Sequence, residues 1–178
     1  MAVLIEALSV VVRVKTIEEK YPGGMIYYER DRPNATYCCD GLLTLVGFMT
    51  PDHVGGFIET LESHGFMVFD PYAEEEEFLD LAVVDQFTGP TRPCKWLSYD
   101  RHPDGYSFAW LTGEEPGELT TPEGWDLENS LSKKHVFIPT DQDEPRIRFL
   151  RSEETLDVFL DEQTGKEVYV ARFGPPKQ

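Results

Sequence analysis

The chain opens with a run of apolar residues that predicts a β-strand. Residues 3–15 are rich in Val, Leu and Ile, and valine dominates the second half of the run, at residues 9–14. Side chains branched at Cβ favour extended backbone because they pack well on a pleated sheet. Glu6 interrupts the run and no basic segment precedes it, so a strand explains the pattern better than a secretory signal peptide does.

The firmest prediction is a helix over residues 51–64. Thr50 can cap its first turn, Pro51 suits the first helical position, and Asp52 complements the helix dipole. Apolar residues then recur at the helical spacing i, i+3, i+4 and i+7, namely Val54, Phe57, Ile58 and Leu61. Gly65 supplies the left-handed residue that ends such a helix. The helix should therefore lay one apolar stripe on a sheet.

A second, shorter helix is expected at about residues 17–21. Thr16 and Glu19 stand three residues apart, as the two members of a capping box do. The sequence Pro22-Gly23-Gly24 should end this helix. The pattern over residues 25–30 does not distinguish a helix from a strand.

Most of the remaining pattern predicts strands. Residues 42–49 are apolar on both alternating faces, which is typical of a strand buried on both sides. Residues 112–132 are rich in Gly, Pro and acids and indicate a long loop. The further candidate strands lie at residues 78–85, 95–101, 106–111, 135–139, 146–151, 155–161 and 166–173.

This order of elements, mixed α and β first and mainly β later, predicts an α+β fold. We expect a largely antiparallel mixed sheet with the helices gathered on one face. A length of 178 residues with 40% apolar content suits a single domain with its own core. We place that domain at residues 1–173, with a possible subdivision within 112–132 and a frayed tail at 174–178.

The charge balance excludes several kinds of partner. Asp and Glu number 33 against 16 Lys and Arg, which gives a formal net charge of −17. A chain this acidic is a poor ligand for nucleic acid and is repelled by anionic membrane surfaces, and no apolar run is long enough to span a bilayer. The three cysteines are an odd number and two of them are adjacent, so reduced thiols in a cytoplasm are expected.

The acidic residues concentrate in two tracts that contain no Lys or Arg. Residues 33–91 hold eleven acids, and residues 102–132 hold seven. Carboxylates are rarely buried without a partner, so we expect the two tracts to meet in one anionic zone on the surface. That zone either serves solubility alone or docks a basic partner. Among functions, we favour an acidic, cytoplasmic, non-enzymatic binding or regulatory protein that docks a basic partner.

Signatures of catalysis and of metal binding are missing from the sequence. There is no Gly-rich phosphate loop, no Gly-x-Ser-x-Gly elbow and no His-Glu-x-x-His motif. The cysteines do not form a Cys-x-x-Cys pair. We therefore predict neither a metal site nor a cofactor.

The best candidate site is the connection at residues 85–96, which combines Asp85, Gln86, Arg92 and Trp96. The alternative function is a small-molecule-binding domain or an enzyme with its pocket here, in which Asp85 acts as acid or base and Arg92 clamps an anion. A proline-stiffened connection whose polar groups hold its own backbone explains the same residues structurally. Asp40, in a turn beside two thiols, is a second candidate.

Overall fold

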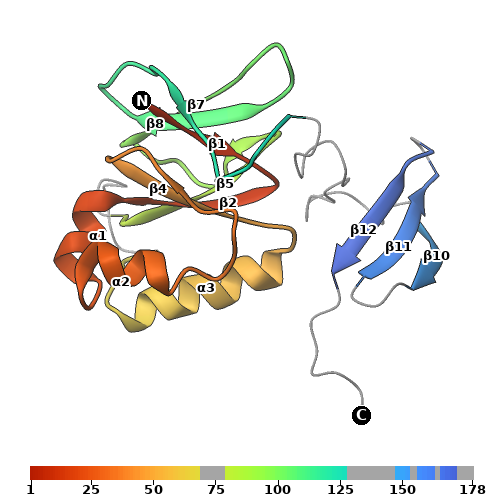
Figure 1. The fold of residues 1–178 in the computed structure, drawn as a ribbon, viewed down its shortest axis with the longest axis horizontal. Coiled ribbons are helices and arrows are strands. Elements are labelled where there is room, and N and C mark those ends of the chain that lie inside the picture. Colours follow the sequence, from red (N-terminus) through yellow and green to blue (C-terminus); the bar gives the residue numbers. More distant parts are fainter. Residues whose placement is uncertain (69–78, 128–146, 153–155, 163–164, 172–178) are drawn as a thin grey trace. The chain divides into compact units, whose positions relative to one another are not determined.

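The computed structural model forms two strands from the apolar N-terminal run (Figure 1). β1 (Ala2–Ile5) and β2 (Leu8–Arg13) are separated by Ala7, whose backbone has a φ of 48°. Residues with a side chain seldom adopt this left-handed conformation. Gln86 holds the bend, because its Oε1 accepts a hydrogen bond from the Ala7 N–H at 2.5 Å and its own N–H donates to the Ala7 carbonyl at 3.0 Å. The bend sends the two halves of one apolar run into two different sheets.

The structure describes residues 1–68, 79–127, 147–152, 156–162 and 165–171. The chain divides into two units, Met1–Asp126 and Leu127–Gln178, and the division falls within the stretch 112–132 named above. The second unit holds an antiparallel sheet of β10 (Ile147–Ser152), β11 (Leu156–Asp161) and β12 (Glu167–Ala171). These strands confirm three of the predictions made for this part of the chain. The prediction of a strand at 135–139 and of a frayed tail at 174–178 lies outside the described residues.

The first unit contains two sheets. The inner sheet is entirely antiparallel and consists, in order, of β3 (Cys38–Cys39), β4 (Leu43–Phe48), β2, β5 (Leu81–Asp85) and β6 (Gly89–Pro90). The outer sheet consists, in order, of β7 (Leu97–Arg101), β8 (Ser107–Leu111), β1 and β9 (Leu119–Thr120). Only the short β1–β9 pair is parallel. The predicted α+β class and largely antiparallel pairing are confirmed, with the strands distributed over three sheets.

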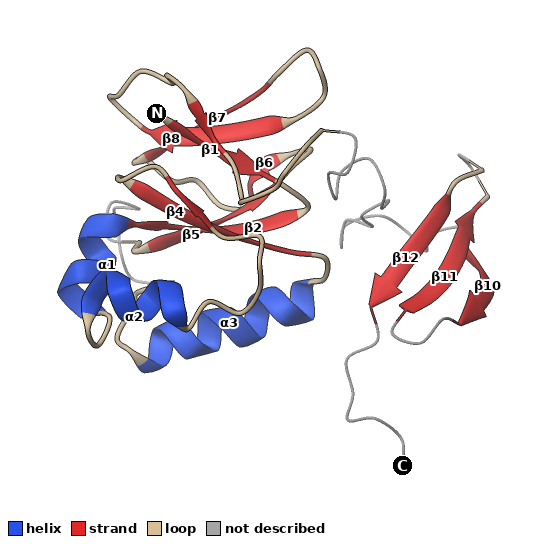
Figure 2. Cartoon of the chain, viewed as in Figure 1, coloured by secondary structure: helices blue, strands red, loops and turns tan. Residues whose placement is uncertain are grey.

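The inner sheet lies between the helices and the outer sheet (Figures 1 and 2). The helices are α1 (Val14–Lys20), α2 (Gly24–Arg30) and α3 (Pro51–Ser63). On the helical face, the ring of Phe57 packs 5.5 Å from that of Phe48 in β4. On the opposite face, Val11 of β2 belongs to the main core together with Val3 of β1 and Ala109 of β8. The first unit is therefore built in three layers.

The helix predicted at 51–64 is confirmed as α3. The Thr50 hydroxyl accepts a hydrogen bond from the His53 N–H at 3.4 Å, and Gly65 has the positive φ, 82°, that ends the helix. Val54 and Leu61 are buried, as expected of the apolar stripe. The 25–30 segment, which the pattern left open, is the helix α2.

The predicted start of the first helix is wrong. α1 begins at Val14, directly after β2, and has no side-chain cap, while Thr16 lies buried within its first turn instead of capping it. The reason is tertiary, because the Val14 N–H donates to the carbonyl of Leu42 at 2.8 Å where the ladder between β2 and β4 ends. The long loop expected at 112–132 also needs correction, since Leu119–Thr120 pairs with β1 as β9.

Candidate functional site

Asp85 and Gln86, two of the predicted site residues, form hydrogen bonds with backbone groups of the protein itself. Both are buried, at 5% and 4% exposed. Asp85 Oδ1 accepts hydrogen bonds from the N–H groups of Phe87 at 2.7 Å and Thr88 at 3.1 Å, so it fixes the turn that follows β5. Gln86 fixes the bend at Ala7, as described above. This arrangement matches the structural explanation of the connection.

Asp40, the second candidate, has the same kind of role. Its side chain is 7% exposed. Asp40 Oδ1 accepts hydrogen bonds from the N–H groups of Leu42 at 2.8 Å and Leu43 at 2.7 Å. The carboxylate thus holds the turn that leads into β4.

Arg92 lines a cavity of about 240 Å³ beside β5. The described residues around the cavity are Ile58, Val68, Leu79, Leu81, Ala82, Val83, Thr91, Arg92 and Cys94. This lining is mainly apolar, and Asp85, Gln86 and Trp96 are not part of it. The structure therefore brings Arg92 to a cavity without the carboxylate expected to act with it.

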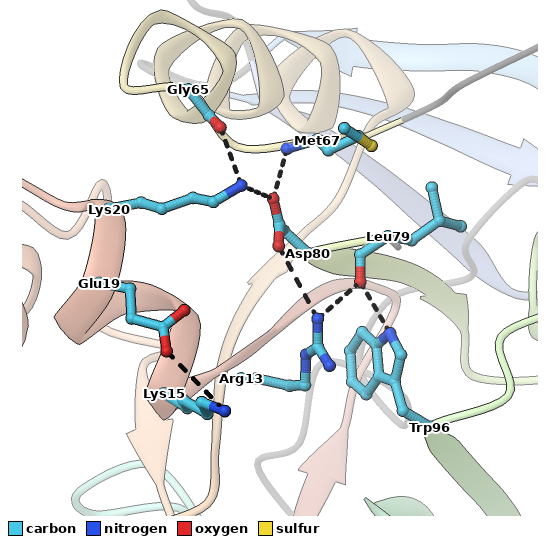
Figure 3. A network of polar contacts seen from close by, with 9 residues as sticks. All are labelled: Arg13, Lys15, Glu19, Lys20, Gly65, Met67, Leu79, Asp80 and Trp96. Carbon is cyan, nitrogen blue, oxygen red and sulfur yellow. Dashed lines mark hydrogen bonds and ion pairs between the residues drawn. The ribbon is translucent and has the colours of Figure 1, made fainter. Parts of the chain in front are cut away.

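Trp96 belongs to a partly buried polar network that also includes Leu79 (Figure 3). Its side chain is 8% exposed, and its Nε1 donates to the Leu79 carbonyl at 2.8 Å. The guanidinium of Arg13 lies over the indole, 5.0 Å from the ring centroid, and also donates to the Leu79 carbonyl at 3.2 Å. Trp96 is thus an internal packing surface for Arg13.

Asp80 is the centre of this network. Its Oδ2 accepts hydrogen bonds at 2.6 Å both from Lys20 Nζ and from the Met67 N–H, and its Oδ1 lies 3.8 Å from Arg13 Nη2. Lys20 also donates to the Gly65 carbonyl at 3.1 Å. The network ties α1 and the end of β2 to the segment after α3 and to the start of β5 (Figure 3). These contacts give the network a structural role, because they hold these elements together.

The two acidic tracts do not form one zone among the described residues. In the first tract, Asp40, Asp80 and Asp85 are buried. The exposed carboxylates of α3 are those of Asp52, Glu59 and Glu62. The exposed carboxylates of the second tract lie in the connections between β7, β8 and β9 or follow β9, at Asp104, Glu114, Glu115, Glu118, Glu123 and Asp126. The prediction of a single zone is therefore wrong for this part of the chain, because the inner sheet separates the two layers (Figure 2). The Glu74–Glu77 run lies outside the described residues.

A row of aromatic side chains follows β8 on the outer face of the outer sheet. Ser107 and Ala109 are buried toward the core, whereas Phe108 and Trp110 alternate with them and stay partly exposed. The Phe108 and Trp110 rings stack with centroids 5.6 Å apart, and the Tyr106 ring lies 6.3 Å from that of Phe108. We call Tyr106, Phe108 and Trp110 the aromatic row.

Two further rings continue the aromatic surface. The His102 ring stacks on Tyr106 at 4.5 Å with an interplanar angle of 7°. Trp125 lies edge-on to Tyr106 at 6.4 Å, and its Nε1 donates to Oε1 of the buried Glu6 at 2.8 Å. Leu4, which pairs with Phe108 across β1 and β8, is fully buried on this face. The aromatic side chains thus cover β1 and still present ring surface to solvent.

Carboxylates border the aromatic row. Asp100 of β7 pairs with Phe108, so both side chains stand on the outer face as direct neighbours, and Asp100 is exposed. Asp104 lies in the turn from β7 to β8, at one end of the row. Glu114, Glu115 and Glu118 lie in the connection from β8 to β9, and Glu123 follows β9. We call the set the acidic rim: Asp100, Asp104, Glu114, Glu115, Glu118 and Glu123.

Within the part of the chain that the structure describes, the acidic rim is largely uncompensated. The segment 102–126 contains no Lys or Arg. The Asp104 carboxylate lies 3.4 Å from Nδ1 of His102, and no described Lys or Arg pairs with Asp104 or with the glutamates of the rim. This face was not identified as a candidate site from the sequence. The signal was the alternation of aromatic and small residues over 106–110.

Comparisons of the chain with models of protein families, with curated proteins and with solved structures find no match. None of the helices in the described ranges has the length and apolar character needed to cross a membrane.

Proposed function

We propose that the protein is a non-enzymatic, cytoplasmic binding protein that docks a basic partner through the aromatic row and the acidic rim. The observation that carries this proposal is the position of Asp100 beside Phe108, which joins an exposed carboxylate to a partly exposed aromatic ring. A cation held over a ring and next to a carboxylate gains from both neighbours. The net charge of −17 adds a long-range attraction for a positively charged protein.

The acidic rim supplies the part of this attraction that salt can screen. Carboxylates without a paired base keep their field in solution, and they speed the encounter with a basic partner at low ionic strength. The aromatic row supplies short-range contact that salt affects little. Binding should therefore weaken with salt without vanishing.

The small-molecule alternative has less support. The observation that favours it is the cavity lined by Arg92. The carboxylate that this alternative needs, Asp85, is occupied by its own turn. We therefore assign the function to the outer sheet.

The test uses soluble poly-arginine and poly-lysine peptides, with poly-glutamate as the negative control, in calorimetric titrations of the full chain. We expect the basic peptides to bind, and their affinity to fall by about tenfold or more between low salt and about 0.5 M salt. Failure of both basic peptides to bind, or affinity that salt leaves unchanged, contradicts the proposal.

Two charge-matched triple variants locate the site. One removes three charges from the acidic rim: Glu114→Gln, Glu115→Gln and Glu118→Gln. The other removes three charges from the helical layer: Asp52→Asn, Glu59→Gln and Glu62→Gln. We expect the rim variant to lose affinity by about tenfold while the helical variant stays within about twofold of the original chain. Equal losses in both variants would show that only total charge matters.

A further inference from the structure

We infer that the occupant of the aromatic row is an extended segment of a partner protein that carries arginines at alternate positions. This inference rests on the proposed function and narrows it, from a basic partner in general to one shape and one cationic side chain. Three observations lead to it: the spacing of the row, the carboxylate beside it, and the way in which this chain uses its own arginines.

The spacing of the row fits an extended ligand. Phe108 and Trp110 occupy alternate positions of β8, Tyr106 stands two residues before Phe108 just outside the strand, and neighbouring ring centroids are 6.3 Å and 5.6 Å apart. Alternate side chains of an extended chain are separated by about 6.8 Å. A partner segment that lies along β8 can therefore place one side chain over each ring. A helix repeats the side chains of one face about 5.4 Å apart, one turn at a time, but its alternate residues point to different sides, so a ligand with arginines at alternate positions can place them all over the row only when it is extended.

The combination of a ring and a neighbouring carboxylate favours arginine as the cationic side chain of the partner. A planar guanidinium can stack on a ring and still direct its N–H groups to a carboxylate at the edge of that ring. Asp100 is the cross-strand neighbour of Phe108 on the same face of the sheet and can supply this carboxylate. The compact ammonium of lysine cannot make a stacked contact of the same area.

The chain itself shows the same arrangement twice. Arg13 lies 5.0 Å from the centroid of Trp96, with the Asp80 carboxylate 3.8 Å away. Arg30 lies 4.3 Å from the centroid of Tyr27 and is bonded to Asp31 at 2.7 Å. Each case combines an arginine, an aromatic ring and a carboxylate.

The aromatic row has two of these three components. Further arginines stack on Tyr37 and Phe87, at 5.5 Å and 5.4 Å. No described arginine stacks on a ring of the aromatic row. The row therefore offers rings and carboxylates, and the third component comes from the partner.

The experiment compares three synthetic peptides of equal length and charge by calorimetric titration of the full chain. The first alternates arginine with serine, the second holds the same arginines in one consecutive block, and the third alternates lysine with serine. We expect the alternating arginine peptide to bind about fivefold more tightly, or better, than either of the others.

Variants of the row and of its neighbour then test the location. Asp100→Asn removes one charge at an exposed position, and Phe108→Leu removes the ring while keeping apolar cover over Leu4. Asp52→Asn on α3 is the charge-matched control. We expect the first two variants to reduce the preference for the alternating arginine peptide to less than about twofold, and the control to keep it. Unchanged thermal unfolding of Asp100→Asn shows that the loss does not come from unfolding.

The outcomes separate this inference from the proposed function. If none of the three peptides binds, the proposed function fails and this inference fails with it. If all three bind equally and in a salt-dependent way, the proposed function holds and this inference is overturned. A preference for alternating arginine that survives both Asp100→Asn and Phe108→Leu also overturns it, because the selective site then lies elsewhere.

Discussion

At the scale of single residues, two carboxylates near α1 illustrate how burial sets the contribution of an ion pair to stability (Figure 3). The Asp80 side chain is 8% exposed and meets Lys20 at 2.6 Å. The Glu19 side chain is 58% exposed and meets Lys15 at 3.9 Å. Water screens the second pair and competes for both of its members, whereas Asp80 also accepts a hydrogen bond from the Met67 N–H.

We therefore expect Asp80→Ala to lower the free energy of unfolding by about 2–3 kcal/mol. This loss is smaller than the loss expected on breaking a fully buried pair, because the Lys20 side chain is one-third exposed and can be hydrated when Asp80 is removed. Glu19→Ala is the control, with an expected loss below about 0.5 kcal/mol. Urea denaturation of both variants measures the difference, and equal losses would contradict the structure's assignment of Asp80 as the centre of the network.

Tyr28 gives a prediction about alkaline pH. Its ring is 2% exposed, and burial raises the pKa of its hydroxyl above the usual value of 10.0. The folded state keeps this proton at a pH at which the unfolded state loses it, so the stability that Tyr28 contributes is complete below pH 10.0 and falls as the pH rises above it. The slope from this one group is at most about 1.4 kcal/mol per pH unit.

Replacing Tyr28 with Phe removes the titrating group and keeps the ring. The Thr44 hydroxyl that contacts it, at 3.4 Å, retains its bond to the Val12 carbonyl. We expect Tyr28→Phe to change stability little near neutral pH and to flatten the decline between about pH 10 and pH 11.5. Denaturation curves at several pH values test this, and identical declines in both proteins would contradict it.

At the scale of elements, α3 was predictable because its signals are local. The Thr50 cap, the proline after it, the apolar spacing and Gly65 all act within a few residues of the helix. The start of α1 was not predictable, because a hydrogen bond from Val14 to the distant Leu42 decides it. The same holds for β9, whose pairing with β1 joins residues far apart in the sequence.

Two glycines at α3 should respond in opposite ways to alanine. Gly65 has a φ of 82°, which an alanine adopts only under strain, whereas Gly55 lies inside the helix with open space around it. We expect Gly65→Ala to destabilise the fold by about 1 kcal/mol. Gly55→Ala should stabilise it by about 0.5–1 kcal/mol. Melting temperatures that move in the same direction for both variants would contradict the reason given for the end of α3.

The candidate site shows the limit of reasoning from residue types. Polar residues gather at 85–96, yet Asp85 bonds to Phe87 and Thr88 and Gln86 bonds to Ala7. Such pairing with the backbone cannot be read from composition. The aromatic alternation around Phe108 is visible in the sequence, but which face of β8 remains partly open depends on the packing of the two sheets.

At the scale of the whole molecule, each unit has its own sheets. The core that joins the inner and outer sheets is composed of residues from Val3 to Leu111, all within the unit Met1–Asp126. The structure therefore places the aromatic row, the acidic rim and this core in one unit.

We expect residues 1–126 to fold without the rest of the chain. The fragment should unfold in a single cooperative transition. It should also bind the poly-arginine probe with an affinity within about threefold of that of the full chain, because it retains both the row and the rim. Circular dichroism and calorimetric titration measure the two properties. A fragment without a cooperative transition would show that the first unit depends on the residues after Asp126.

The pairing of β1 with β8 has a consequence for the growing polypeptide at the ribosome. Val3 pairs with Ala109, so the two strands that support the aromatic row are synthesised more than one hundred residues apart. The β2–β4 pair can form much earlier, from residues 8 to 48, whereas the apolar strand β1 stays unpaired until β8 has emerged. The surface that we assign to partner binding is therefore among the last parts of this unit to be assembled, and a stalled or truncated translation product does not display it.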